Sequence, residues 1–260
     1  MTGERESMAT SRGETFTRKA SWEQASLESG GYEETDLVST LTARAAEERP
    51  WTQVIESAYV QGREMELIHA LQTVVSFLKN PETLDVADVG GGNGYMAAIA
   101  RHRMHFQRFQ WTIFESKAVS DSYQRFESES EILWMENVER NFDRVVDIAI
   151  VSCTMHYLSE PHALLNFLST KSQYLLLMRV PLVDEPEDIP TIQSPNDGIY
   201  AQVNAHWPAW FLSRTRFDAT LKEVGDVVFR WFTNEVWQFE GGPILLEGVL
   251  LRTKAARSPA

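Results

Sequence analysis

Cysteine is nearly missing from this sequence, which has one, Cys153, among 260 residues. No intrachain disulfide or thiolate metal cluster can therefore form, and this usage favours a reducing compartment. Basic residues are also few, because 24 Lys and Arg stand against 37 Asp and Glu, giving a formal net charge of −13. Nucleic-acid binding relies on clustered Lys and Arg, so we expect no nucleic-acid partner.

Long apolar runs are absent as well. No segment approaches the roughly 20 consecutive apolar residues of a membrane-spanning helix, and the first residues lack the apolar core of a signal peptide. We therefore expect a cytoplasmic protein without a membrane partner. The histidines show no metal-ligand spacing with the carboxylates, so no metal is assigned.

The chain divides into a polar start, a helical extension and a core. Residues 1–19 are poor in large apolar side chains and are predicted to form a disordered tail. Residues 20–80 are predicted to form an N-terminal helical extension or lid. This extension starts with a short helix that Ser21 caps and Gly30-Gly31 ends. Residues 81–254 are predicted to form the core, and residues 255–260 a tail.

Within the core, short apolar runs alternate with segments whose apolar residues recur at helical spacing. Strands followed by helices are typical of an α/β fold, here a doubly wound, mostly parallel seven-stranded sheet of Rossmann-like type. The last two strands have no helix between them, which predicts an antiparallel C-terminal hairpin. A loop over 181–212 is long enough to act as a lid. The predicted strands are 84–89, 110–115, 131–135, 145–152, 174–180, 226–234 and 243–253, and the predicted helices are 94–104, 117–126, 161–170 and 214–224.

A glycine-rich loop carries the strongest chemical signal. Asp88 and Gly90, Gly91, Gly92 and Gly94 lie between the first predicted strand and a helix. Glycines let the backbone approach a ligand closely, and the helix N-terminus offers N–H groups to an anion. Glu115 ends the next strand, where a carboxylate can accept both hydroxyls of a ribose. Together these features indicate a nucleotide site, whereas the plain alternative is a glycine-rich turn beside a surface glutamate.

Two cofactors fit this loop. Gly92, Gly94 and Ala97 satisfy the G-x-G-x-x-A pattern of NAD(P) sites, but that pattern starts two residues late. The residues from Asp88 to Gly94 instead fit D-x-G-x-G-x-G. That pattern resembles motif I of class I S-adenosylmethionine-dependent methyltransferases, whose last strand is also inserted antiparallel. We therefore favour S-adenosyl-L-methionine as the cofactor.

This resemblance implies a set of site residues. Asp88 and the glycine backbone would hold the methionine moiety, and Glu115 would hold the ribose. Residues after the third and fourth strands would contact the adenine and the sulfonium. The implied adenine residues are Met135, Glu136 and Asn137, and the implied sulfonium residues are Ser152 and Cys153, with Thr154 beside them.

A narrower resemblance extends over residues 21–253. The segment from Ser21 to Ala25, followed by Gly31-Tyr32, resembles the N-terminal S-W-E-x-A…G-Y segment of a poorly characterised methyltransferase family. The match continues through Tyr157-Leu158-Ser159-Glu160-Pro161 and through Trp207-Pro208-Ala209-Trp210-Phe211. The chain departs from that family at Gly92-Asn93, where Ser-Leu is common, and at His156, where Gln is more usual.

Three residues are candidates for the chemistry. His156 follows the fourth strand and is placed to act as a general base, or else it packs in the core. Arg179 ends the fifth strand and could clamp a carboxylate or phosphate, or pair with an acid in 184–188. Tyr200 belongs to the aromatics of the predicted lid that would wall off the donor, together with Trp207, Trp210 and Phe211.

Several functions remain open at this stage. The leading one is O- or N-methylation of a small-molecule acceptor by an S-adenosylmethionine-dependent transferase. A second uses the same donor as a cyclase, a lyase or an aminocarboxypropyl transferase, for example forming azetidine-2-carboxylate with release of methylthioadenosine. A donor-binding scaffold without catalysis is a third, and an NAD(P) oxidoreductase is a fourth. The oligomeric state stays undetermined.

Overall fold

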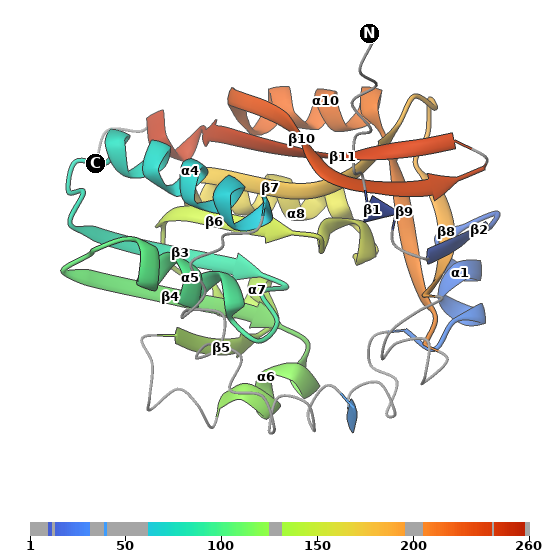
Figure 1. The fold of residues 1–260 in the computed structure, drawn as a ribbon, viewed down its shortest axis with the longest axis horizontal. Coiled ribbons are helices and arrows are strands. Elements are labelled where there is room, and N and C mark those ends of the chain that lie inside the picture. The colour runs from blue at the N-terminus through green and yellow to red at the C-terminus, as the bar shows by residue number, and fades with distance from the viewer. Residues whose placement is uncertain are drawn as a thin grey trace, which may run out of the picture.

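The computed structural model describes residues 10–11, 14–31, 39–40, 62–124, 132–195, 205–240 and 242–257. Five parallel strands form one side of its sheet and end at β5, in the spatial order β5-β4-β3-β6-β7 (Figure 1). These strands are β3 (Thr83–Val89), β4 (Arg108–Glu115), β5 (Ile132–Glu136), β6 (Val146–Ser152) and β7 (Ser172–Val183). Of the predicted helical extension over 20–80, residues 32–38 and 41–61 lie outside the described residues.

Helices cover both faces of this sheet, because alternate strand residues point to opposite sides. On β7, Leu176 and Met178 join the cluster beneath α4 (Gly62–Phe77) and α5 (Tyr95–Arg103). Leu175 and Leu177 join the opposite cluster beneath α8 (Pro161–Lys171) and α10 (Arg214–Val224). The shorter helical elements are α6 (Lys117–Tyr123), α7 (Val138–Asn141), η2 (Met155–Tyr157) and η3 (Ala255–Arg257).

The C-terminal hairpin is confirmed. β10 (Gly225–Phe239) and β11 (Gly242–Thr253) pair antiparallel, and β11 lies antiparallel against β7. The sheet does not stop at the seven predicted strands, since it is mixed and contains eleven among the described residues. The prediction of an α/β fold is right, but its strand count is too small.

The additional strands come from segments predicted to be a loop and a tail. β8 (Ile189–Pro195) and β9 (Trp207–Ser213) pair antiparallel within the predicted loop, and β2 (Glu14–Arg18) pairs with β8. A fourth strand, β1 (Thr10–Ser11), lies beside β10. β8 and β9 therefore take up part of the segment predicted to be a loop over 181–212, and β2 takes up part of the tail predicted to be disordered through residue 19. Prolines and acidic residues in this segment interrupt the apolar pattern, so the sequence does not indicate β8 and β9 as strands.

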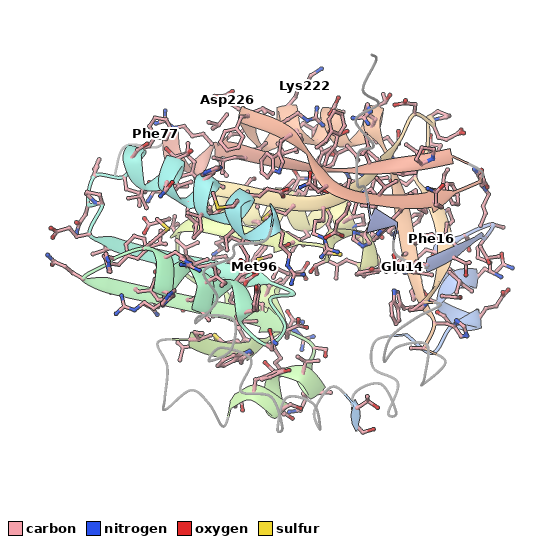
Figure 2. All side chains as sticks on the ribbon, viewed as in Figure 1. Glu14, Phe16, Phe77, Met96, Lys222 and Asp226 are labelled. Carbon is pink, nitrogen blue, oxygen red and sulfur yellow. The ribbon has the colours of Figure 1, made fainter. Side chains whose placement is uncertain are left out.

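Aromatic packing holds this extension together. Phe16, labelled on β2 in Figure 2, packs its ring against Phe211 at 4.9 Å and Trp237 at 5.0 Å between centroids. Trp22 opens α1 (Trp22–Glu28) and stacks on Trp210 at 4.9 Å. One partly buried ring thus fixes this largely polar segment to the core.

Capping residues behave as the sequence predicts. The Ser21 hydroxyl accepts a hydrogen bond from the Gln24 N–H at 3.2 Å, at the start of α1. Ser213 caps α10 in the same way, and Gly225 ends that helix. Among the described residues, no helix has the length and apolar character needed to cross a bilayer.

Candidate functional site

The glycine loop joins β3 to α5 at the carboxyl edge of the sheet. Gly90, Gly92 and Gly94 have φ values of 73°, 56° and 75°, in the left-handed region that favours glycine. A Cβ added at Gly90 would lie 2.1 Å from the Thr154 hydroxyl oxygen, and one at Gly91 would lie 2.4 Å from a carboxylate oxygen of Asp88. At Gly90, backbone geometry and close approach both require glycine.

Glu115 faces this loop from the end of β4. Its carboxylate accepts hydrogen bonds from the Gly92 N–H at 2.9 Å and the Ser116 N–H at 3.2 Å. Burial raises the pKa of Glu115, and these two N–H groups lower it. The predicted contact between the glycine loop and Glu115 is thus present. The Gly92 N–H, however, is hydrogen-bonded to the carboxylate, whereas the motif alone suggests that it is free.

Asp88 lies beneath the loop and is 1% exposed. One carboxylate oxygen accepts from the Trp111 indole N–H at 3.0 Å, and the other, Oδ1, has no hydrogen-bond partner among the described residues. Burial raises the pKa of Asp88 to about 7, the Trp111 bond opposes this rise, and the charge of Glu115 adds to it. A buried acceptor atom is therefore available to a ligand that brings a donor or a positive charge.

Two cavities open on either side of Gly90. The larger, which we call the large cavity, has a volume of about 440 Å³, and the small cavity has about 120 Å³. The large cavity is lined by Val89, Gly90, Phe114, Glu115, Ser116, Asn137, Val138, Glu139, Thr154, Leu158, Ser159, Glu160 and Leu164. The small cavity is lined by Arg63, Asp88, Gly90, Gly91, Tyr95, Met96, Ser152 and Arg179.

The small cavity combines opposite charges with unsatisfied polar atoms. Asp88 Oδ1, Ser152 Oγ and Arg179 Nε are all buried and have no partner among the described residues. Arg63 contributes a second guanidinium from α4. Buried polar atoms are normally hydrogen-bonded, so this grouping suits a ligand that carries both an ammonium and a carboxylate. Sequence reasoning missed Arg63, because it saw only an amphipathic helix there.

Arg179 reaches the small cavity through an irregularity in β7. Val180 pairs with Glu247 and Leu177 with Val249, so β7 has one residue more than β11 between these pairs. Arg179 takes a φ of 62° in this bulge, a conformation that bulges next to active sites use to redirect a side chain.

The ion pair of Arg179 is with Glu235 on β10, not with an acid in 184–188. Nη2 donates to Glu235 Oε2 at 2.6 Å, and both side chains are largely buried. Burial alone lowers the pKa of Arg179, but the neighbouring Cys153 and Glu235 raise it above its ordinary value. The guanidinium therefore stays charged inside the fold. The partner was missed because Glu235 lies in a second irregular stretch, on β10.

His156 is fully buried, next to Tyr157 and Trp237, with ring centroids 4.0 Å and 5.0 Å away. Neither ring nitrogen has a hydrogen-bond partner in the part of the chain that is described. Burial lowers the pKa of His156 well below 6.5, and the charge of Arg179 acts in the same direction. The imidazole is therefore neutral at pH 7.

The remaining predicted residues lie at different points around the cavities. Cys153 directly follows β6 with a φ of 54°, between Ser152 of the small cavity and Thr154 of the large one. Asn137 lines the large cavity with a φ of 48° and caps α7. Met135 packs against the cluster beneath α8, and Glu136 is exposed opposite Glu115.

The predicted lid aromatics lie outside the described residues or in the core. Tyr200 lies outside the described residues. Trp207 and Phe211, predicted as lid aromatics, are 3% and 0% exposed in β9, so they are core residues. Within the described ranges, no group of three or more His, Cys, Asp or Glu residues could hold a metal ion.

Comparison with known proteins shows the fold. No protein-family model and no curated protein sequence matches the chain. Among solved structures, the N-terminal domain of EvdMO1 in the presence of SAH and D-fucose has 13% identity and a TM-score of 0.52, over 82% of this chain and 96% of that one. At this identity the likeness establishes a methyltransferase-like α/β fold with a mixed sheet.

Two further structures are similar at lower scores. The CcbJ methyltransferase from Streptomyces caelestis has 10% identity and a TM-score of 0.49, over 75% of this chain and 91% of that one. Magnesium protoporphyrin IX methyltransferase (ChlM) from Synechocystis PCC 6803 with bound SAH has 13% identity and a TM-score of 0.47, over 83% and 98%.

Proposed function

We propose that this protein is an S-adenosylmethionine-dependent methyltransferase that methylates an oxygen or nitrogen of a small-molecule acceptor. One observation carries the proposal: two cavities of different chemistry share Gly90, one lined by apolar, polar and acidic residues that include Glu115, the other by side chains of opposite charge. S-adenosylmethionine has the matching division into a nucleoside and an amino acid. The solved structure of similar fold was obtained in the presence of SAH, which supports the same reading.

Each end of the donor has residues to hold it. In the large cavity, Glu115 would accept the ribose hydroxyls, and the loop at Asn137 would contact the adenine. In the small cavity, Asp88 would accept from the ammonium, while Arg63 and Arg179 would donate to the carboxylate. Two atoms fit this assignment, because Asp88 Oδ1 has no donor and Arg179 Nε has no acceptor among the described residues.

The donor supplies a methyl group on a positively charged sulfur, so the chain mainly has to orient groups and exclude water. Ser152 lines the small cavity, and Cys153 lies in the chain between it and Thr154 of the large cavity, which supports their assignment to the sulfonium. His156 is fully buried, lines neither cavity and has a pKa well below 6.5, which favours its alternative as a packed core residue over the role of general base. Tyr200 remains a proposed acceptor-side residue on sequence grounds alone. The proposal involves a small-molecule partner in the cytoplasm, without nucleic acid, membrane or metal.

Calorimetry with the purified full chain tests the donor first. We expect SAH to bind and NAD(P) not to bind, and a protein that ignores both SAH and S-adenosylmethionine would refute the proposal. Incubation with S-adenosylmethionine and a metabolite extract, followed by mass spectrometry, then tests the chemistry. SAH that forms only with the extract supports methyl transfer. Methylthioadenosine formed without any acceptor would instead support cyclase or lyase chemistry, and binding without turnover would support a scaffold.

Arg179→Met tests the assignment of the small cavity. Loss of a charged hydrogen bond to the carboxylate should weaken SAH binding by about 1.5–3 kcal/mol. Binding of methylthioadenosine, which lacks the amino-acid arm, should stay unchanged in the same variant. Equal losses for both ligands would show that Arg179 supports the fold and does not contact the arm.

A further inference from the structure

Two buried tryptophans reach the glycine motif from neighbouring strands. Trp111 on β4 is fully buried, and its indole N–H donates to Asp88 Oδ2 at 3.0 Å. Trp134 on β5 is 2% exposed, and its N–H donates to the Gly92 carbonyl oxygen at 3.0 Å. Both indoles thus use their single donor on the segment that forms the candidate donor site.

Trp134 fixes one side of Gly92 while Glu115 fixes the other. The Gly92 N–H bonds to Glu115 at 2.9 Å, and its carbonyl accepts from Trp134. A Cβ at Gly92 would meet nothing within 4 Å, so nothing packs against the residue in that direction. If Glu115 accepts the ribose hydroxyls, its bond to Gly92 competes with the ligand. Trp134 then remains as the anchor of the loop.

Trp111 acts on the acid in a different way. Its N–H occupies Oδ2 of Asp88, a residue that lines the small cavity, and leaves Oδ1 without a partner among the described residues. The bond also favours the ionised carboxylate, against the effect of burial. A phenylalanine would fill most of the same space without donating. The indole therefore sets both the orientation and the charge of Asp88.

We propose that Trp111 and Trp134 are positioning residues of the donor site, one holding Asp88 ready for the ammonium and the other holding the loop carbonyl at Gly92. The inference rests on the proposed function, because the ligand it serves is the donor. Neither indole touches the reacting atoms, so both act through the groups they orient.

Three matched substitutions test this role: Trp111→Phe, Trp134→Phe and Trp207→Phe. Trp207 is the control because it is 3% exposed and donates to Gln193 Oε1 at 2.9 Å, away from the glycine motif. Losing one hydrogen bond should weaken SAH binding about 3- to 10-fold in the first two variants and leave the control unchanged. Urea unfolding of all three should show comparable losses of stability, since each loses a buried indole and its bond.

A pH profile separates positioning from simple packing. SAH binding should tighten as Asp88 ionises, and Trp111→Phe should move the midpoint of that change to higher pH, because the N–H that favours the carboxylate is gone. Trp134→Phe should weaken binding equally at every pH. The other polar groups facing Asp88 or its cavity are Arg63, Tyr95, Glu115, Ser152 and Arg179, and none is changed by these substitutions.

The outcomes distinguish the two proposals. Failure of the unsubstituted protein to bind SAH refutes the proposed function. The positioning role is refuted if that protein binds SAH normally while Trp111→Phe and Trp134→Phe bind it as well as Trp207→Phe does, once their losses of stability are taken into account. An unmoved pH midpoint in Trp111→Phe refutes it for Trp111 alone.

Discussion

Replacing Asp88 with Asn should stabilise the protein while weakening donor binding. Burial raises the pKa of Asp88 from 3.8 to about 7, so the native state holds this proton over a pH range where the unfolded chain has lost it. The free energy of unfolding therefore falls as the pH rises through that range. A shift of about 3 units corresponds to about 4 kcal/mol once both states are ionised. Asparagine has nearly the same shape, can still accept from Trp111, and has no such cost.

The pH dependence of the difference isolates this one group. Between about pH 5.5 and about pH 8, the stability advantage of Asp88→Asn over the unsubstituted protein should grow by about 2 kcal/mol. Urea unfolding at the two pH values measures it, provided that the m-value stays constant. The exposed Asp143 offers a control, and Asp143→Asn should show no such growth. A constant difference for Asp88→Asn would show that Asp88 does not titrate in this range, and the reasoning from burial would fail.

Three more substitutions or modifications probe the same site. Glu115→Gln should weaken SAH binding by about 1–3 kcal/mol in calorimetry, and an unchanged dissociation constant would remove the carboxylate from the ribose site. Gly90→Ala should lower stability by about 1–3 kcal/mol and abolish binding, because its Cβ meets Thr154 at a left-handed φ; normal urea unfolding would contradict this. Alkylation of Cys153 by iodoacetamide, followed by mass spectrometry, should slow in proportion to bound SAH, and an unaffected rate would place the thiol outside the site.

Local signals in the sequence were enough to find the first half of the site. Asp88 and the glycines occur within one short segment, and a parallel sheet places the end of the next strand beside that segment, so Glu115 could be anticipated. The limits of α10 were likewise readable, since Ser213 and Gly225 mark both ends. These features can be predicted because they depend on residues close in sequence or on one regular connection between two parallel strands.

The other half of the site depends on irregular strand pairing and on contacts between residues far apart in sequence. Arg63 joins the small cavity from a helix whose periodicity reports only its buried face. Arg179 and Glu235 meet because β7 and β10 both depart from regular pairing, and no composition signal predicts a bulge. The strand at Glu14–Arg18 finds its partner at the far side of the chain. Sequence periodicity contains no record of these pairings.

The pairing of β2 with β8 has a consequence for how the chain is made. Thr15 lies beside Ser194, 179 residues later, so the first of these strands leaves the ribosome long before its partner exists. At about 5–20 residues per second, that delay lasts on the order of 10–40 s. Throughout this interval Phe16 has no Phe211 or Trp237 to cover it. β2 can therefore pair with β8 only late in synthesis, and its segment must be kept soluble during translation until then.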